Sequence, residues 1–426
     1  MLKKNSMILC LVLILVFVMM VSLIGNAKEI KLRFLSLQVG VHPETAWATE
    51  TVEKFNTEYK GRINIVVDGV AGDEAWWEKL RTDAALNTMP DLFTLKHDRS
   101  EFNVLAQSGL VLALNDYIKT DPYLKDMLND PVALAAYTDK KGNILGIPYA
   151  RAHVGIYYNT ELFARAGIFK FPTTWDDFFV ACEKLKAANI TPISMMTGEN
   201  AWCSMLMLAN MIGTTPGGTE WLTTDPADQK FNVPVFVNAA VKLQQVLSKY
   251  TTLDAVGAGY GLAANNFLQG NTAMIANGPW MIGSFSDPKS APADFESKVS
   301  YALSPGDGVI AMENIAWGVG SKTKEKQDAA VEFLKFLMRQ DVYAAYLSVG
   351  GAAPCFKVDM SEVSYPRLNK EFLPKALEAK YKYSIVPNVV KPAIINVMSQ
   401  YLPGIADLSM TPEEFVKKLE ETHKAN

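Results

Sequence analysis

Residues 31–69 decide the fold and read KLRFLSLQVGVHPETAWATETVEKFNTEYKGRINIVVDG. The segment Lys31–Leu37 is rich in apolar residues with partial alternation, which predicts a strand. Glu44–Tyr59 then places apolar residues near helical spacing, and Arg62–Val67 predicts a second strand that ends at Asp68-Gly69. A strand, a helix and a strand within this short stretch predict a βαβ unit with a right-handed crossover.

The next segment extends this sheet. Asp73–Leu86 has a helical pattern, and Asp91–Leu95 predicts a third strand. In open α/β sheets, ligands bind beyond the carboxyl ends of the strands. This rule points to residues 38–42 after the first strand and to residues 96–99 after the third.

The first 27 residues have the layout of a secretory signal peptide. Lys3 and Lys4 form a short positive region, Met7–Ile24 carries no charge, and small residues surround Asn26 before a cleavage point after Ala27. The alternative is a retained anchor, because the apolar run is long enough to span a bilayer. We expect residues 1–27 to be removed and the mature protein to be exported.

Length and composition limit the class of protein. A chain of 426 residues predicts two to three domains, and its 49% hydrophobic and 20% charged residues are typical of a globular protein. A formal net charge of −4 argues against a nucleic-acid binder, which usually carries a basic face.

No catalytic or metal motif stands out. Three cysteines follow the predicted cleavage point (Cys182, Cys203 and Cys355), an odd number whose spacing matches no zinc or C-x-x-C pattern, so we expect buried thiols. The four histidines form no pair at helical ligand spacing, and neither a G-x-S-x-G elbow nor a glycine-rich phosphate loop stands out. The sequence therefore predicts no metal and no cofactor, while an enzyme stays an open alternative.

Several short motifs follow one another in a fixed order from Gly146. They are Gly146-Ile147-Pro148-Tyr149, Tyr157-Tyr158-Asn159, Ala166-Gly167-Ile168, Pro172-Thr173-Thr174-Trp175, residues 267–274 (FLQGNTAM), Asn277-Gly278-Pro279-Trp280 and Leu303-Ser304-Pro305-Gly306. Each is weak alone, but in this order they resemble the extracellular sugar-binding proteins of ABC importers, the family that includes maltose-binding protein. Residues 90–93 and 97–99 resemble that member itself.

The resemblance implies an α/β fold of the type II periplasmic binding proteins, with two open α/β lobes joined by a multi-strand hinge. It implies three passages of the chain between the lobes, near residues 150–153, 311–315 and 347–352. The first lobe is then residues 28–150 plus 316–349, and the second is residues 153–312 plus 353–426.

Polar candidates for ligand contact come from both the strand ends and the resemblance. Asp98 and Arg99 match sugar-contacting positions of the family, with His97 beside them, and the alternative is a surface ion pair. Arg151 at the first passage and Gln38 beyond the first strand are further candidates. Leu95 and Ala152 stand where maltose-binding protein has a stacking tryptophan and an acidic residue, so the resemblance does not imply maltodextrin as the ligand.

Aromatic candidates are needed because sugar C–H faces stack on rings. Trp280 matches the family's stacking aromatic after the Asn-Gly-Pro turn, and Trp202 follows a polar loop that faces the ligand in the family. Trp47, Trp317 and Tyr149 are weaker candidates, and core packing is the alternative for each. We assign Trp175 to the core, and we expect one of the adjacent Trp76 and Trp77 to be buried and the other exposed or facing the ligand.

These features predict the exported substrate-binding component of an ABC importer, which captures a sugar or oligosaccharide between its lobes and delivers it to membrane permease subunits. We expect a monomer in the periplasm or at the cell surface. The first alternative is a binder of another solute, such as a polyamine, a phosphate ester or a peptide. The second is a secreted glycoside-acting enzyme, which needs two carboxylates at one bond, such as Asp98 and Glu313.

Overall fold

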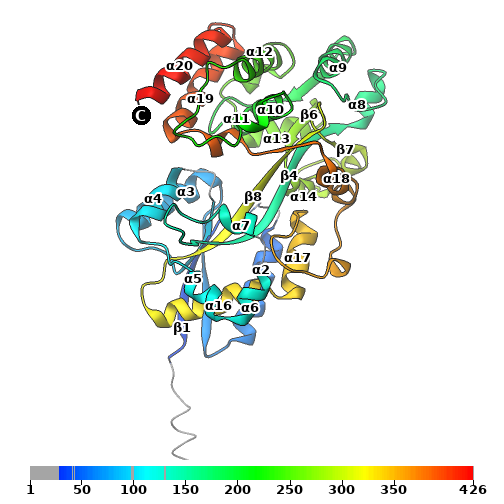
Figure 1. Cartoon of the computed structure of the whole chain (residues 1–426). Helices are drawn as coiled ribbons and strands as arrows, with labels where there is room; N and C mark the ends of the chain where they lie inside the picture. The colour runs from blue at the N-terminus through cyan, green and yellow to red at the C-terminus, as the bar shows by residue number, and fades with distance from the viewer. Residues whose placement is uncertain (1–27, 41, 43, 97–99, 129–130, 426) are drawn as a thin grey trace, which may run out of the picture.

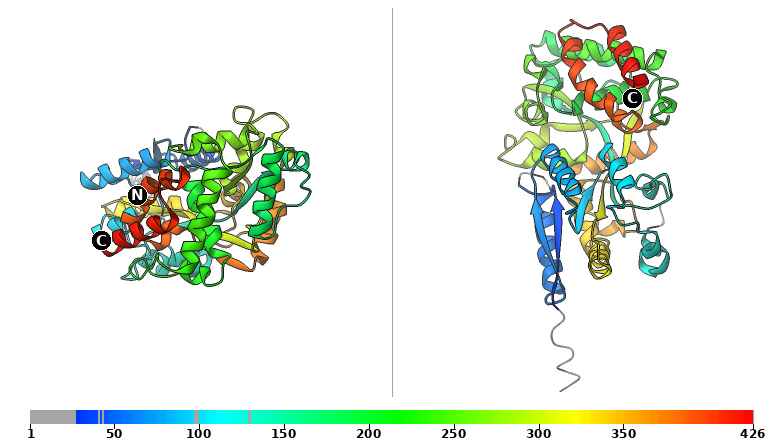
Figure 2. Two further views of the ribbon diagram at one scale, coloured as in Figure 1. Left: turned by 90° about the horizontal axis from the view of Figure 1, so that it is seen from above. Right: turned by 90° about the vertical axis from the view of Figure 1, so that its left-hand side faces the viewer.

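The computed structural model describes residues 28–40, 42, 44–96, 100–128 and 131–425. These residues form two lobes, which lie one above the other in both side views (Figures 1 and 2). Two long strands, β4 (Ile147–Asn159) and β8 (Gly308–Val319), run from one lobe into the other (Figure 1). The predicted α/β fold of two lobes joined by a hinge is confirmed.

The first lobe is built on the predicted βαβ unit. Strand β1 (Ile30–Ser36) pairs in parallel with β2 (Ile63–Gly69) from Ile30↔Ile63 to Ser36↔Gly69, and helix α2 (Thr45–Glu58) connects them. Helix α3 (Asp73–Ala85) leads to β3 (Leu92–Leu95), which is parallel to the other side of β1. All three predicted strands are therefore present in the expected order.

The two long strands form the hinge. They pair antiparallel from Ile147↔Trp317 to Val154↔Ile310, with irregular register around Ala150. At one end β8 pairs with β3 of the first lobe, and at the other end β4 pairs with β6 (Thr272–Asn277) and β7 (Val299–Ala302). One continuous sheet, in the order β2-β1-β3-β8-β4-β6-β5, thus crosses between the lobes.

Strand β4 begins at Ile147, within the motif Gly146-Ile147-Pro148-Tyr149. Most of its residues are buried on both faces, so the first half shows no alternation of apolar and polar residues that would reveal a strand. The other two strands are β5 (Thr191–Ser194), which pairs with β6, and β9 (Tyr381–Tyr383), which pairs with β8.

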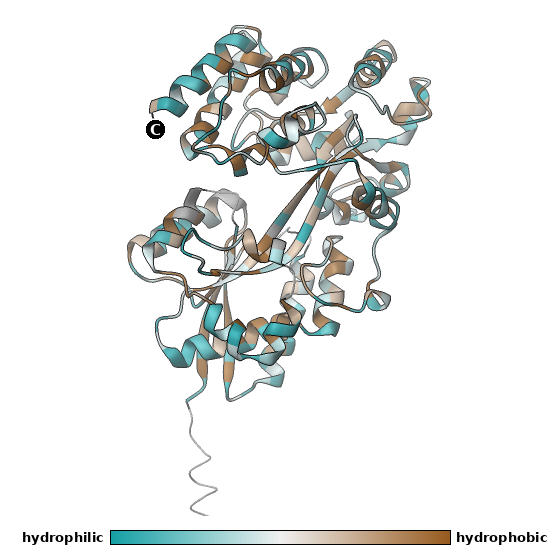
Figure 3. Cartoon of the chain, in the orientation of Figure 1, coloured by the Kyte–Doolittle hydropathy of each residue, from teal (hydrophilic) through white to brown (hydrophobic). Residues whose placement is uncertain are grey.

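Helices cover the sheet in each lobe, with their hydrophilic residues outward, as along α20 (Figure 3). The first lobe also carries α4 (Ser100–Ser108), α5 (Asn115–Thr120), α6 (Pro122–Met127), α7 (Pro131–Ala135), α16 (Lys324–Leu337) and α17 (Gln340–Gly350). The second lobe carries α8 (Thr160–Arg165), α9 (Trp175–Ala187), α10 (Trp202–Gly213), α11 (Gly218–Trp221), α12 (Pro234–Lys249), α13 (Tyr260–Leu268), α14 (Ile282–Ser286), α15 (Phe295–Lys298), α18 (Arg367–Glu378), α19 (Pro392–Ala406) and α20 (Pro412–Ala425).

Helix α9 shows how the sequence sets a local element. The Thr174 hydroxyl caps the helix by accepting a hydrogen bond from the backbone N–H of Asp177 (3.1 Å). Trp175, Phe178, Cys182 and Leu185 then lie on one buried face. Trp175 is a core residue, as predicted.

Core packing leads us to propose that the third passage between the lobes lies later in the chain than the expected residues 347–352. Cys355 and Phe356 pack in the core of the first lobe, and Tyr365 packs against the same core. Leu368 and Phe372 of α18 pack in the second lobe. On this packing we propose that residues 353–365 belong with the first lobe and that the second resumes near Pro366.

The prediction that one of Trp76 and Trp77 is buried and the other is exposed or faces the ligand is not met, because both side chains are fully buried. Both lie in one cluster of the first lobe, with ring centroids 4.8 Å apart. Across the described ranges, no helix has the length and apolar character needed to cross a bilayer.

Candidate ligand-binding site

The register of the sheet brings the carboxyl ends of strands from both lobes toward the hinge. Strand β3 ends at Leu95 opposite Ala316, and β6 ends at Asn277 opposite Gly155. Each of these strands therefore ends within a few residues of the pair Arg151↔Glu313 on β4 and β8. Because ligands of open α/β sheets bind at such strand ends, this region is the candidate site.

Trp280 is held by the turn that follows β6. The turn carbonyls of Asn277 and Gly278 accept hydrogen bonds from the hydroxyls of Tyr301 (2.8 Å) and Tyr157 (3.0 Å). The Trp280 ring lies directly against Gly278, where an added Cβ atom would come within 2.3 Å of the ring. Gly278 has an ordinary φ of −98°, so space rather than backbone conformation requires glycine here.

Trp202 lies beside Trp280. Their ring centroids are 6.1 Å apart with the planes at 49°, and both rings are half-buried against the core of the second lobe. The structure thus brings together the two strongest aromatic candidates. A half-buried pair of large rings offers an apolar surface with a fixed orientation.

Polar groups surround this aromatic pair. The Tyr260 hydroxyl accepts a hydrogen bond from the side-chain amide of Asn277 (2.9 Å), and the Glu199 carboxylate accepts one from the Tyr260 backbone N–H (3.1 Å). Burial raises the pKa of Tyr260 well above its usual value, so the hydroxyl stays neutral. Glu199 and Ala201 have φ values of 51° and 50°, a left-handed conformation that is strained for these residues.

The hinge itself carries an ion pair. The Arg151 guanidinium lies 3.0–3.1 Å from one carboxylate oxygen of Glu313, and 23% and 14% of the two side chains are exposed. Burial lowers the pKa of His153 to about 4, and the charges of Arg151 and Lys382 act in the same direction. His153 is therefore neutral at physiological pH, and the positive charge of Arg151 is balanced across the hinge.

In the first lobe, Gln38 lies just beyond β1 and is buried, and its side-chain amide donates to the Glu44 carboxylate. Burial raises the pKa of Glu44 to about 7, against the effects of the Gln38 hydrogen bond and the charge of Lys96. Sequence reasoning missed Glu44, because a glutamate that precedes a helix is usually solvated. The nearby strand end was the only signal that could have found it.

Tyr149 lies between Trp47 and Trp317 and contacts both rings in the core of the first lobe. Tyr149 lies 5.8 Å from Trp47 and 5.6 Å from Trp317 between ring centroids, and all three side chains are buried. The Trp47 indole donates to the carbonyl of Val342, and the Tyr149 hydroxyl donates to that of Leu337. In this conformation the three rings pack the lobe, and we leave them out of the site proposed below.

His97, Asp98 and Arg99 lie outside the described residues. The three cysteines of the described chain are buried, and burial raises the pKa of Cys203 to about 12, so its thiol is protonated. Within the same part of the chain, no cluster of three metal-ligating side chains occurs.

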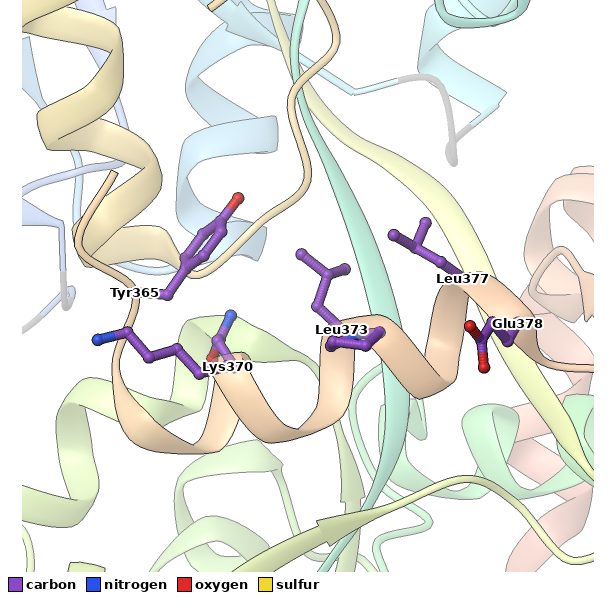
Figure 4. Close-up of a pocket in the computed structure, with 7 residues that line it drawn as sticks. Tyr365, Lys370, Leu373, Leu377 and Glu378 are labelled. Carbon is purple, nitrogen blue, oxygen red and sulfur yellow. The ribbon is translucent and has the colours of Figure 1, made fainter. Parts of the chain in front are cut away.

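A separate pocket of about 410 Å³, which neither Trp202 nor Trp280 lines, lies along α18 (Figure 4). Leu373 and Leu377 line it together with Tyr365, whose hydroxyl donates to the carbonyl of Ala352 (2.7 Å). Of its lining residues, Tyr365 contacts the first-lobe core, and the others belong to α18, which packs in the second lobe through Leu368 and Phe372. None of the predicted ligand-binding residues that the structure describes lines it.

Comparison with known proteins identifies the family. The family described as bacterial extracellular solute-binding protein matches residues 50–360 of the chain. The chain is a bacterial extracellular solute-binding protein. The predicted family membership is therefore confirmed.

The relatives of this solute-binding protein are named for different ligands. It is similar to a lactose-binding protein of Rhizobium radiobacter, 23% identical over 71% of this chain and 70% of the relative. It is also similar to an sn-glycerol-3-phosphate-binding periplasmic protein of Rhizobium meliloti, 24% identical over 60% of each chain. A solved structure of a chitin oligosaccharide binding protein superposes with a TM-score of 0.82 over 93% of this chain and 98% of the other, at 24% identity. That likeness shows the shared fold.

Proposed function

We propose that this solute-binding protein captures a sugar or oligosaccharide between its lobes and delivers it to the membrane permease subunits of an ABC importer. The observation that carries the proposal is the fixed, half-buried pair of Trp202 and Trp280 at a strand end beside the hinge. Sugar rings present C–H faces that stack on such indoles, while their hydroxyls need polar groups of fixed geometry, as around Tyr260.

Closure is proposed to occur about β4 and β8. The irregular register between Pro148 and Arg151 breaks the regular ladder at the place where the chain passes between the lobes. A ligand that contacts both lobes binds the closed form more tightly and so shifts the population toward it. On the first-lobe side we propose Gln38 and Arg151, together with His97, Asp98 and Arg99, as contacts.

The charge near the hinge favours an uncharged ligand. Arg151 is already paired with Glu313, and an anion site needs several cationic groups or helix N-termini. The second candidate is a phosphate ester, which the similarity to glycerol-phosphate-binding proteins favours. Lactose, maltotriose, a chitin oligosaccharide and sn-glycerol 3-phosphate therefore belong in one ligand panel.

The remaining parts of the proposal follow from the family. We propose that the protein acts without cofactor, metal or nucleic acid and as a monomer, in the periplasm or at the cell surface after removal of residues 1–27. We also propose that it does not hydrolyse its ligand. Incubation with each oligosaccharide, followed by product analysis, tests this point, and release of smaller sugars would contradict it.

Isothermal titration with the panel tests the central proposal. We expect saturable binding of at least one saccharide, with a stabilisation of about 2.7 kcal/mol at a ligand concentration of 100 times Kd. Trp280→Ala should weaken this binding by about 30-fold or more, as for a central aromatic contact. Phe169→Ala is the control, because Phe169 is 84% exposed and should not affect binding. Heat from sn-glycerol 3-phosphate alone would favour the second candidate.

A further inference from the structure

The Tyr301 hydroxyl joins the hinge strand to the turn that holds Trp280. It accepts a hydrogen bond from the backbone N–H of Gly155 (3.0 Å). Its single proton lies within hydrogen-bond distance of two carbonyl oxygens, those of His153 (2.9 Å) and Asn277 (2.8 Å). Only 3% of Tyr301 is exposed. One buried hydroxyl therefore ties two positions of β4, just beyond Arg151, to the end of β6.

The ring of Tyr301 is fixed as firmly as its hydroxyl. It stacks between Tyr157 of β4, at 3.9 Å and 13°, and Phe372 of α18, at 3.7 Å and 28°. A Cβ atom at Gly155 would come within 2.8 Å of the Phe372 ring, so this stack depends on the glycine. The three rings come from β4, β7 and the helix that follows the third passage between the lobes.

The two tyrosines of this stack together orient the turn. Tyr157 donates to the carbonyl of Gly278, the residue against which the Trp280 ring lies. Tyr301 donates to the carbonyl of the preceding residue, Asn277. Hydrogen bonds thus connect β4 near the hinge to the backbone turn that carries Trp280.

We propose that Tyr301 is a positioning residue for ligand binding: it couples the hinge strand β4 to the Trp280 ring, so that the ring takes its binding orientation only with the hydroxyl in place. This proposal rests on the proposed function, since it concerns the same site. Tyr301 itself is buried and contacts no ligand.

The first experiment needs no ligand. Near-ultraviolet circular dichroism of the full mature chain reports the environment of the tryptophans. Tyr301→Phe keeps the stacked ring and removes only the hydroxyl, and we expect it to change the tryptophan bands. In a Trp280→Phe background the same substitution should leave those bands unchanged. A change of equal size in both backgrounds, or no change in either, would overturn the proposal.

The second experiment measures affinity for the tightest saccharide of the panel. Tyr301→Phe should weaken binding by about five- to thirty-fold, the range expected when a buried hydrogen-bonding group loses its partner. Tyr250→Phe is the matched control, because its buried hydroxyl bonds to Glu183 (2.6 Å) and Gln245 (3.3 Å), away from the turn and the hinge. It should lower the melting temperature to a similar extent and leave Kd unchanged.

The outcomes separate the two proposals. Equal Kd values for Tyr301→Phe and the unmodified chain, or equal weakening by Tyr250→Phe, would refute the positioning role. If no saccharide binds, the proposed function fails. The comparison of Tyr301→Phe in the two backgrounds by circular dichroism still decides whether Tyr301 orients Trp280.

Discussion

Replacing Gly278 by alanine tests the geometry of the candidate site most directly. An added Cβ atom would lie 2.3 Å from the nearest atoms of the Trp280 ring, whereas carbon atoms in contact are normally about 3.5 Å apart. The ring must therefore move by about 1 Å or leave its rotamer, which costs about 0.5–1.5 kcal/mol. Alanine itself tolerates the backbone conformation of φ −98° and ψ 179°.

The two effects on stability nearly cancel. A glycine-to-alanine change in a permitted conformation stabilises a protein by about 0.4–1 kcal/mol through the unfolded chain. The free energy of unfolding should therefore change by less than about 1 kcal/mol. Saccharide binding should nevertheless weaken by about tenfold, because the ring is displaced from its binding orientation.

Titration calorimetry and thermal unfolding on the same sample separate these effects. Gly261→Ala is the control, since an added Cβ atom there meets nothing within 4 Å, and it should bind as the unmodified chain does. If Gly278→Ala changed the tryptophan emission spectrum but kept full affinity, the Trp280 ring would not be the binding surface, and if the spectrum stayed unchanged, the expected displacement of the ring would be wrong.

Three further predictions concern the buried carboxyl group of Glu44, the ion pair between Arg151 and Glu313, and the helix cap at Thr174. The folded state favours protonated Glu44, so the free energy of unfolding should fall as pH rises from about 4.5 to about 7, by roughly 2–3 kcal/mol. Denaturant titrations over pH should show this slope reduced in Glu44→Gln, and an identical slope would contradict the assignment. Glu313→Gln should destabilise the chain by about 1–2 kcal/mol, because it leaves the Arg151 charge half-buried without its carboxylate, and the double variant with Arg151→Gln should recover part of the loss. Thr174→Ala should lose about 1 kcal/mol in urea denaturation while Thr174→Ser does not, and equal losses would argue against the cap to Asp177.

Local signals in the sequence were sufficient for several elements. The alternation in β1, the spacing in α2 and the cap of α9 each depend on residues close together in the chain. Such signals do not specify whether a side chain is buried by residues that are distant in the sequence. Glu44 is buried beside Gln38 and Tyr346, and the last of these is far away in the sequence, so its environment could not be foreseen.

The sequence by itself determined the βαβ start, because periodicity and turn chemistry act over a few residues, and the order of its motifs was enough for the resemblance to the family. Only the tertiary structure decided which aromatic rings remain partly exposed. Trp47, Tyr149 and Trp317 are enclosed by α17 and β8, whereas Trp202 and Trp280 lie half-buried beside each other. The physical reason is that the exposure of a large apolar side chain depends on which surfaces meet over it, and those surfaces come from segments more than a hundred residues apart.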